Sequence, residues 1–236
     1  MATTFIGQSP LLDMAVAQLE PNSLVLDVGS GNGRNSLYLA DLGHQVMALD
    51  IAPEYLLDLE RQALSLGRIA AQNILPVVGD ISEPMFREDM FDIVVANYVL
   101  QYVDKPIVHD LQDLTKPGGL NVVEAYIGTP DQQSAKRQWS LYEPGELKAL
   151  YQQAGWEIRG HSETLRPFSI HTDELSGKIT SLVSSSTKLI AKKPGSLTPL
   201  HRSSPVVAQK DTSRLAEYWR RADPEWYEHL VQLGEI

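Results

Sequence analysis

The sequence contains no cysteine among its 236 residues, and this absence excludes disulfide bonds, thiolate metal ligands and a cysteine nucleophile. It also lacks any run of about 18 apolar residues, the length that a membrane-spanning helix requires. Basic residues are scarce: 20 lysines and arginines stand against 30 acidic residues, for a formal net charge of -10. Such a surface repels a phosphate backbone, so the composition argues against a nucleic-acid partner.

The chain has the size and composition of one globular domain with a short extension. We expect a domain over residues 1–193, a Pro- and Ser-rich linker over 194–211 and a short helical extension over 212–236. The apolar stripe of that extension, which includes Trp219 and Trp226, predicts docking onto its own domain or onto a second subunit in a homodimer. The N-terminus lacks the basic start and apolar core of a signal peptide, so we expect a cytoplasmic protein with no membrane partner.

Short apolar runs alternate with longer amphipathic segments, and this alternation predicts a parallel α/β fold. The expected strands are Leu24–Val28, Gln45–Leu49, Leu75–Val78, Phe91–Ala96, Gly119–Ala125, Trp156–His161 and Thr187–Lys192. The expected helices are Arg34–Leu42, Pro53–Leu66, Pro106–Leu114 and Pro144–Ala154. Apolar runs around Ile170 and over 181–190 have no long helix between them, which predicts antiparallel pairing. The expected fold is therefore a doubly wound, mostly parallel Rossmann-like sheet with an antiparallel C-terminal edge strand.

The first strand runs into a loop with glycine at every second position, Gly29, Gly31 and Gly33. Glycines let the backbone turn sharply and approach a ligand closely, and free amides at the start of a helix favour an anionic group. Nicotinamide-binding loops place their third glycine three residues after the second, whereas here it follows after two. Asp27 also suits the ammonium of an amino-acid moiety better than a pyrophosphate. The loop therefore indicates S-adenosylmethionine (SAM) as the cofactor.

Acidic residues end the next two strands as well. Asp50 follows the second strand, where a carboxylate can accept hydrogen bonds from both ribose hydroxyls. Asp80 follows the third strand and can accept a hydrogen bond from an adenine amino group, although for Asp80 taken alone a helix N-cap is the favoured explanation. Neighbouring residues complete the expected cofactor contacts on these three loops: Ser30, Asn35, Ile51 and Ile81.

The fourth strand ends in Asn97 and Tyr98, at the edge where open α/β sheets gather their ligands. We expect these two residues and Tyr102 to line the cofactor pocket, because an aromatic face can hold a sulfonium. The alternative for Tyr102 is packing beneath the following helix. No metal site is expected.

With these residues in place, the sequence resembles the class I SAM-dependent methyltransferases, and more narrowly the tellurite-resistance (TehB-like) methyltransferase family. The words that carry the resemblance are GNGRNSLYLA from Gly31 and TKPGG from Thr115, with fainter ones at Gly145-Glu146-Leu147 and Gly155-Trp156-Glu157. It covers roughly residues 10–193. The resemblance implies cofactor contacts at Asp27, Gly29, Gly31, Asp50, Asp80 and around Asn97.

The residues that the family carries over its acceptor pocket are matched less completely in this sequence. The family carries a histidine followed by arginine over its acceptor pocket, with another arginine shortly after. The nearest match here is His171-Thr172, with Lys178 the next basic residue, so the resemblance makes His171 the candidate catalytic residue. The missing arginine leaves two acceptor classes open, an oxyanion such as tellurite or selenite and a small organic nucleophile.

Two other classes of protein share some of these features. A SAM-binding regulatory or scaffold protein would keep the cofactor loop without turnover. A nicotinamide-dependent oxidoreductase would share the sheet, but the glycine spacing disfavours it. Because the chain has neither a basic stripe nor an inserted substrate module, we expect a small-molecule acceptor rather than a macromolecule.

Overall fold

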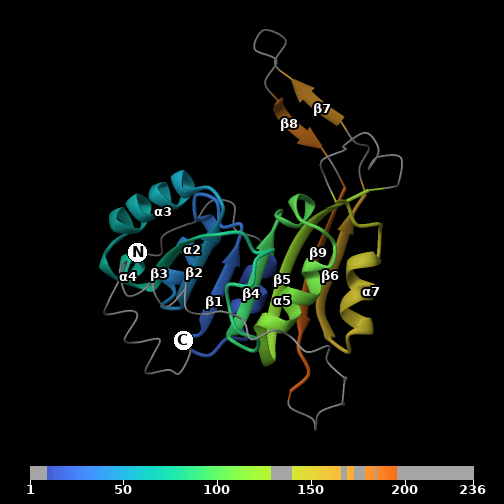
Figure 1. The fold of residues 1–236 in the computed structure, drawn as a ribbon, viewed down its shortest axis with the longest axis horizontal. Helices are drawn as coiled ribbons and strands as arrows, with labels where there is room; N and C mark the ends of the chain where they lie inside the picture. The colour runs from blue at the N-terminus through green and yellow to red at the C-terminus, as the bar shows by residue number, and fades with distance from the viewer. Residues whose placement is uncertain (1–9, 129–139, 166–168, 173–178, 184, 196–236) are drawn as a thin grey trace.

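The computed structural model describes residues 10–128, 140–165, 169–172, 179–183 and 185–195. Its centre is a seven-stranded sheet with helices on both faces (Figure 1). The strands of this sheet are β1 (Leu24–Val28), β2 (Gln45–Asp50), β3 (Ile74–Val78), β4 (Phe91–Asn97), β5 (Thr115–Ile127), β6 (Glu157–Thr164) and β9 (Ser185–Lys192). A separate two-stranded sheet consists of β7 (Ser169–Thr172) and β8 (Ile179–Val183). The helices are α1 (Pro10–Val16), α2 (Arg34–Asp41), α3 (Pro53–Leu66), α4 (Arg68–Asn73), η1 (Leu100–Tyr102), α5 (Ile107–Leu114) and α7 (Glu146–Gln153).

The strand order of the large sheet is β3-β2-β1-β4-β5-β9-β6. The pairings from β3 to β5 are all parallel, and β9 is antiparallel to both of its neighbours. This confirms the predicted doubly wound, mostly parallel fold. The antiparallel strand β9 lies one position in from the edge, which β6 forms. Between β6 and β9 the described residues form only β7 and β8 and no helix, so these two sheet neighbours have no helical crossover of the kind that parallel strands need.

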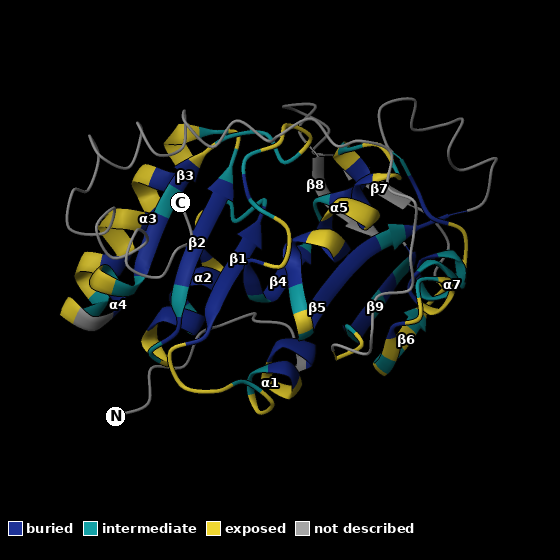
Figure 2. Ribbon diagram, turned by 60° about the horizontal axis from the view of Figure 1, so that its bottom comes forward, coloured by how far each residue is buried: buried dark blue, intermediate teal, exposed yellow. Residues whose placement is uncertain are grey.

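The two faces of the sheet form two apolar clusters, because successive strand residues point to opposite sides. On one face Leu26 belongs to the cluster that includes Leu111 of α5 and Leu147 of α7. On the other face Val25 belongs to the cluster that includes Leu59 of α3. Figure 2 shows the central strands buried along their length and the helices exposed on one side only. Burial on both faces explains the nearly continuous apolar runs in the sequence.

Several short elements were not predicted from the sequence. Helix α4 begins after Gly67, whose φ of 131° is unfavourable for other residues, and it is only six residues long. Helix α1 is also short, with Leu12 and Ala15 fully buried. Helices of this length show too few turns for an apolar period to stand out. By contrast, α3 begins and ends at the predicted residues, Pro53 and Leu66.

The predicted linker and helical extension lie almost entirely outside the described residues, which end at 195. The domain division and the homodimer through the C-terminal helices therefore stay predictions. Within the described part of the chain, no helix is long and apolar enough to cross a membrane.

Candidate functional site

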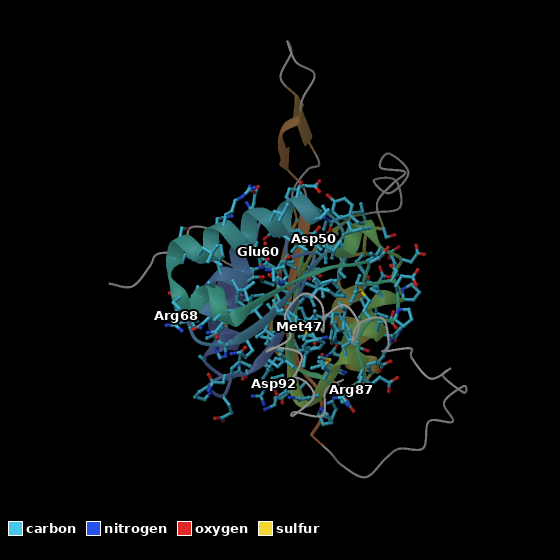
Figure 3. The ribbon with its side chains drawn as sticks, turned by 60° about the vertical axis from the view of Figure 1, so that its left-hand side comes forward. Met47, Asp50, Glu60, Arg68, Arg87 and Asp92 are labelled. Carbon is cyan, nitrogen blue, oxygen red and sulfur yellow. The ribbon has the colours of Figure 1, made fainter. Side chains whose placement is uncertain are left out.

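A cavity of about 480 Å³ opens at the carboxyl ends of β1 to β4. This is within the usual size range of small-molecule sites, about 300–1,000 Å³. Its lining consists of Val28, Gly29, Gly31, Leu49, Asp50, Ile51, Ala52, Tyr55, Gly79, Asp80, Ile81, Tyr98, Val99, Tyr102 and Val103. Figure 3 shows Asp50 at this end of the strands and Asp92 at the opposite end. Eight of the predicted site residues thus line one cavity: Gly29, Gly31, Asp50, Ile51, Asp80, Ile81, Tyr98 and Tyr102.

The three glycines of the cofactor loop all have positive φ, but they face different surroundings. A Cβ at Gly29 would lie 2.6 Å from Cγ2 of Val99, and one at Gly33 would collide with Leu59 of α3. A Cβ at Gly31 would meet no described atom within 4 Å. Gly31 is therefore the position at which a ligand can approach the backbone. Gly33 does not line the cavity, and its lack of a side chain lets the loop pack against α3.

Asp50 joins the loops that follow three neighbouring strands. Its Oδ2 accepts a hydrogen bond from the backbone N–H of Gly31 at 2.8 Å, and its Oδ1 accepts one from Ala52 at 2.9 Å. Its own carbonyl accepts a hydrogen bond from the N–H of Gly79 at 3.0 Å. Each carboxylate oxygen can accept a second hydrogen bond, so the carboxylate can still receive the two hydroxyls of a ribose.

Asp80 and the two isoleucines form the other end of the cavity. Oδ1 of Asp80 accepts a hydrogen bond from the N–H of Ser82 at 2.9 Å, as in an Asx turn. Asp80 therefore fixes a local turn. No helix lies between β3 and β4, so the N-cap alternative for Asp80 is wrong. Its place in the cavity lining leaves the adenine contact open to it as well. The neighbouring Ile51 is 69% exposed, an apolar surface that a purine ring could cover.

Asp27 lies beneath the cavity instead of in its lining. It is 1% exposed, and its Oδ2 accepts a hydrogen bond from the hydroxyl of Ser36 at 2.6 Å. Burial raises the pKa of Asp27 to about 6, since a carboxylate in apolar surroundings loses its hydration. A cationic group brought close to Asp27 would favour the charged form.

A set of buried polar atoms beside Asp27 has no hydrogen-bond partner among the described residues: Oγ of Ser30, Oδ1 of Asn35, and both Oδ1 and Nδ2 of Asn97. Because Val28 pairs with Ala96, Asn97 lies across from Gly29 at the end of the strands. Most buried polar groups in proteins are paired, so these atoms mark a place for a polar ligand or water. An amino-acid moiety carries both the donors and the acceptors that would satisfy them.

The residues present therefore fit SAM. A cavity of suitable volume joins a carboxylate placed for a diol to a cluster of unpaired polar groups. None of the residues that the structure describes form a group of three or more histidine or acidic side chains able to hold a metal ion.

Tyr98 and Tyr102 form the β4 side of the cavity. Tyr98 has a φ of 54°, which is uncommon for a residue with a side chain. Burial raises the pKa of Tyr98 to about 12, and the nearby carboxylate of Glu124 adds to the effect. The sequence analysis did not identify Glu124, which is 2% exposed. A single acidic residue within an apolar strand was the signal that could have found it.

His171, the candidate catalytic residue, belongs to the small two-stranded sheet. It lies in β7, where it pairs with Ser181 of β8, and Figure 1 shows this small sheet projecting beyond the ends of β9 and β6. The side chain of His171 and the whole of Lys178 lie outside the described residues. A catalytic role for His171 stays a prediction.

Comparison with known proteins finds several relatives, most of them named as methyltransferases. "Hemagglutinin 1" of Eikenella corrodens is 28% identical over 177 residues, covering 72% of this chain and 54% of the relative. A probable SAM-dependent methyltransferase TehB of Haemophilus influenzae is 29% identical over 164 residues, covering 66% and 53%. The tRNA 5-carboxymethoxyuridine methyltransferase of Escherichia coli is 26% identical over 174 residues, covering 63% and 66%. The chain spans about half the length of the first two relatives.

Among solved structures, TehB from Haemophilus influenzae superposes with a TM-score of 0.62 at 23% identity, covering 80% of this chain and 63% of that one. At this identity the likeness shows the fold, which is that of the class I SAM-dependent methyltransferases. The family of the tellurite resistance protein TehB matches residues 8–182, well over half of the chain. The chain belongs to the TehB family.

Proposed function

We propose that the chain is a SAM-dependent methyltransferase whose acceptor is a small molecule. The observation that carries the proposal is the position of Asp50, whose carboxylate is fixed by Gly31 and Ala52 at the wall of a cavity of cofactor size. The unpaired polar atoms of Ser30, Asn35 and Asn97 support it, because they lie where the amino-acid end of SAM would be needed.

In this proposal the chain's residues bind and orient the cofactor without forming a covalent intermediate. Asp50 receives the ribose hydroxyls, Asp80 and Ile81 hold the adenine, and Asp27 faces the ammonium of the methionine moiety. The cofactor supplies an electrophilic methyl group on a sulfonium. Alignment of the acceptor and exclusion of water account for much of the acceleration in such transfers, so no catalytic triad is required.

The acceptor class follows from charge and from the family. A net charge of -10 disfavours the tRNA that the Escherichia coli relative is named for. The family to which the chain belongs favours a tellurite- or selenite-like oxyanion, which needs a local positive charge. That charge would have to come from Arg166 or Lys178, the basic residues near His171 in the sequence. A small organic nucleophile is the second candidate.

The proposal is tested with the full chain, SAM and separate acceptors. Calorimetry should show binding of SAM and of its product S-adenosylhomocysteine, and turnover should release S-adenosylhomocysteine only when an acceptor is present. Volatile methylated tellurium, made by the wild type and reduced in His171→Ala, would support the oxyanion. His109→Ala is the matched control, since His109 lies on the exposed side of α5. Binding without turnover on any acceptor would instead favour a regulatory or scaffold role.

A further inference from the structure

A cluster of tyrosines extends from the cavity toward β5. The ring centroids of Tyr98 and Tyr126 are 4.9 Å apart, with an angle of 39° between the ring planes. Tyr102, the last residue of η1, is 65% exposed. Tyr98 and Tyr102 line the cavity, and the ring of Tyr126 lies against that of Tyr98 next to this wall.

The backbone holds Tyr98 in this cluster at an energetic cost. A residue with a side chain at φ 54° is strained, and such strain persists only where the surroundings fix it. Here the N–H of Tyr98 donates to the carbonyl of Glu124 at 2.6 Å, and the side-chain amide of Gln101 donates to the carbonyl of Tyr98. Both polar groups of the Tyr98 backbone are thus used to aim its ring. Strained residues of this kind gather at ligand sites.

Glu124 brings an ion-paired carboxylate to the cluster. Its Oε2 lies 3.2 Å from Nζ of Lys188 in β9, and its Oε1 has no hydrogen-bond partner within the described ranges. The charge of Lys188 is therefore already matched and does not remain for a bound anion.

These features favour a particular kind of occupant. Tyrosine rings offer wide, flat surfaces that bind other rings by offset or edge-to-face contacts, and their faces attract cations. The carboxylate oxygen of Glu124 that lacks a partner needs a hydrogen-bond donor, which a neutral or cationic hydroxyl or amine carries and a deprotonated anion does not. An oxyanion requires the reverse, a set of cationic or N–H donors facing it.

We propose that Tyr98, Tyr102 and Tyr126, with Glu124 behind them, form the acceptor subsite, and that the acceptor is a planar organic hydroxyl or amine compound, neutral or cationic. The inference rests on the proposed methyltransferase function and narrows its acceptor class. It assigns no proton transfer to these residues. Their role is to select and orient the acceptor beside the cofactor.

The test uses matched probes on the full chain saturated with S-adenosylhomocysteine, with affinities measured by calorimetry. 2-Naphthol is the planar probe, decahydro-2-naphthol its saturated counterpart, 2-naphthoate its anionic counterpart, and selenite the oxyanion. We expect 2-naphthol to bind at least tenfold more tightly than each of the other three.

Tyr126→Leu should weaken the binding of 2-naphthol about three- to tenfold, as expected for loss of one aromatic contact, and leave S-adenosylhomocysteine binding within about twofold. Glu124→Gln should reduce the difference in affinity between 2-naphthol and 2-naphthoate.

Tyr38→Leu is the control, because Tyr38 is a partly buried tyrosine of α2 whose hydroxyl bonds to Asp13 away from the cluster. It should leave the 2-naphthol affinity unchanged. If Tyr126→Leu does not fold, Tyr126→Met replaces it, since a flexible methionine can fill the space without offering a ring. Equal affinity for 2-naphthol and decahydro-2-naphthol, or tighter binding of selenite, would overturn the subsite while leaving the methyltransferase proposal standing. Failure of the wild type to bind S-adenosylhomocysteine would instead overturn the proposed function.

Discussion

The carboxylate of Asp50 accepts a hydrogen bond from the N–H of Gly31 at 2.8 Å, across two neighbouring loops. The acid thus performs two tasks. It holds the glycine loop in the conformation that leaves Gly31 open to a ligand, and it presents further lone pairs to the cavity. A substitution at Asp50 should therefore affect both the order of the loop and the affinity for the cofactor.

Asp50→Ala should weaken binding of S-adenosylhomocysteine at least about 100-fold. Two charge-assisted hydrogen bonds to the ribose are lost, each of about 1.5–3 kcal/mol. Calorimetry measures the affinity, and amide hydrogen exchange at Gly31 reports the loosened loop. The control is Asp58→Ala on α3, where Asp58 is exposed and pairs with Arg61. Equal affinities of wild type and Asp50→Ala would exclude Asp50 from the cofactor site.

Alanine substitutions at Gly29 and Gly31 should affect the stability of the domain and the binding of the cofactor to different extents. Alanine at Gly29 or Gly31 costs about 1 kcal/mol of stability, because the backbone there has a positive φ. Gly29→Ala must also displace Val99, which adds about 1–3 kcal/mol, whereas Gly31→Ala meets open space. Thermal unfolding should therefore show a larger loss for Gly29→Ala. Binding of S-adenosylhomocysteine should fall in Gly31→Ala by more than its small loss of stability explains; equal effects of both variants on both measurements would contradict this reading.

Much of the fold was predictable because the strands are short apolar runs that end in recognisable residues. Asp50 and Asp80 mark the ends of β2 and β3 in the sequence, and the structure places both in the cavity lining. The position of β9 one strand in from the edge was not predictable, since it depends on pairing between segments far apart in the chain. Helices α1 and α4 were not predicted from the sequence because they span too few turns for an apolar period to show.

The residues of the candidate site were predictable where backbone conformation or ligand chemistry requires a particular residue type. They were less predictable where the packing of distant segments determines which residues meet. Alternating glycines mark the loop, but spacing alone cannot say that Gly33 faces Leu59 while Gly31 faces open space. Glu124 was missed because its partner Lys188 lies on a distant strand that only the folded sheet brings beside it. The tyrosine cluster has the same origin, since Tyr98 and Tyr126 meet across β4 and β5.

Removal of residues 196–236 tests the predicted domain division. Lys193, just after β9, donates to Oδ1 of Asp89 and to the carbonyl of Thr115, both at 2.6 Å, so the end of the last strand is fixed within the domain. The shortened chain should still bind S-adenosylhomocysteine. If the C-terminal helices dock as predicted, the melting temperature should fall or the mass measured by light scattering should decrease. No change in either would show that the extension is an independent appendage.

The last prediction concerns the pH dependence of stability that Asp27 imposes. Burial raises the pKa of Asp27 from 3.8 to about 6, so the folded state binds this proton more tightly than the unfolded state does. The stabilisation is complete below pH 3.8 and is lost as the pH rises through about 6. The difference between the two pKa values corresponds to about 3 kcal/mol as an upper figure.

Asp27→Asn should remove this dependence. Denaturant unfolding between pH 4 and 8 should show that the free energy of unfolding of the wild type falls over about pH 4–6 relative to the variant. The amide can still accept the hydrogen bond from Ser36, but it cannot balance an ammonium. The variant should therefore gain up to about 3 kcal/mol of stability at pH 7.5 while binding S-adenosylhomocysteine more weakly. Asp58→Asn on exposed α3 serves as the control and should keep the wild-type slope; the same slope in Asp27→Asn would show that Asp27 is not the titrating group.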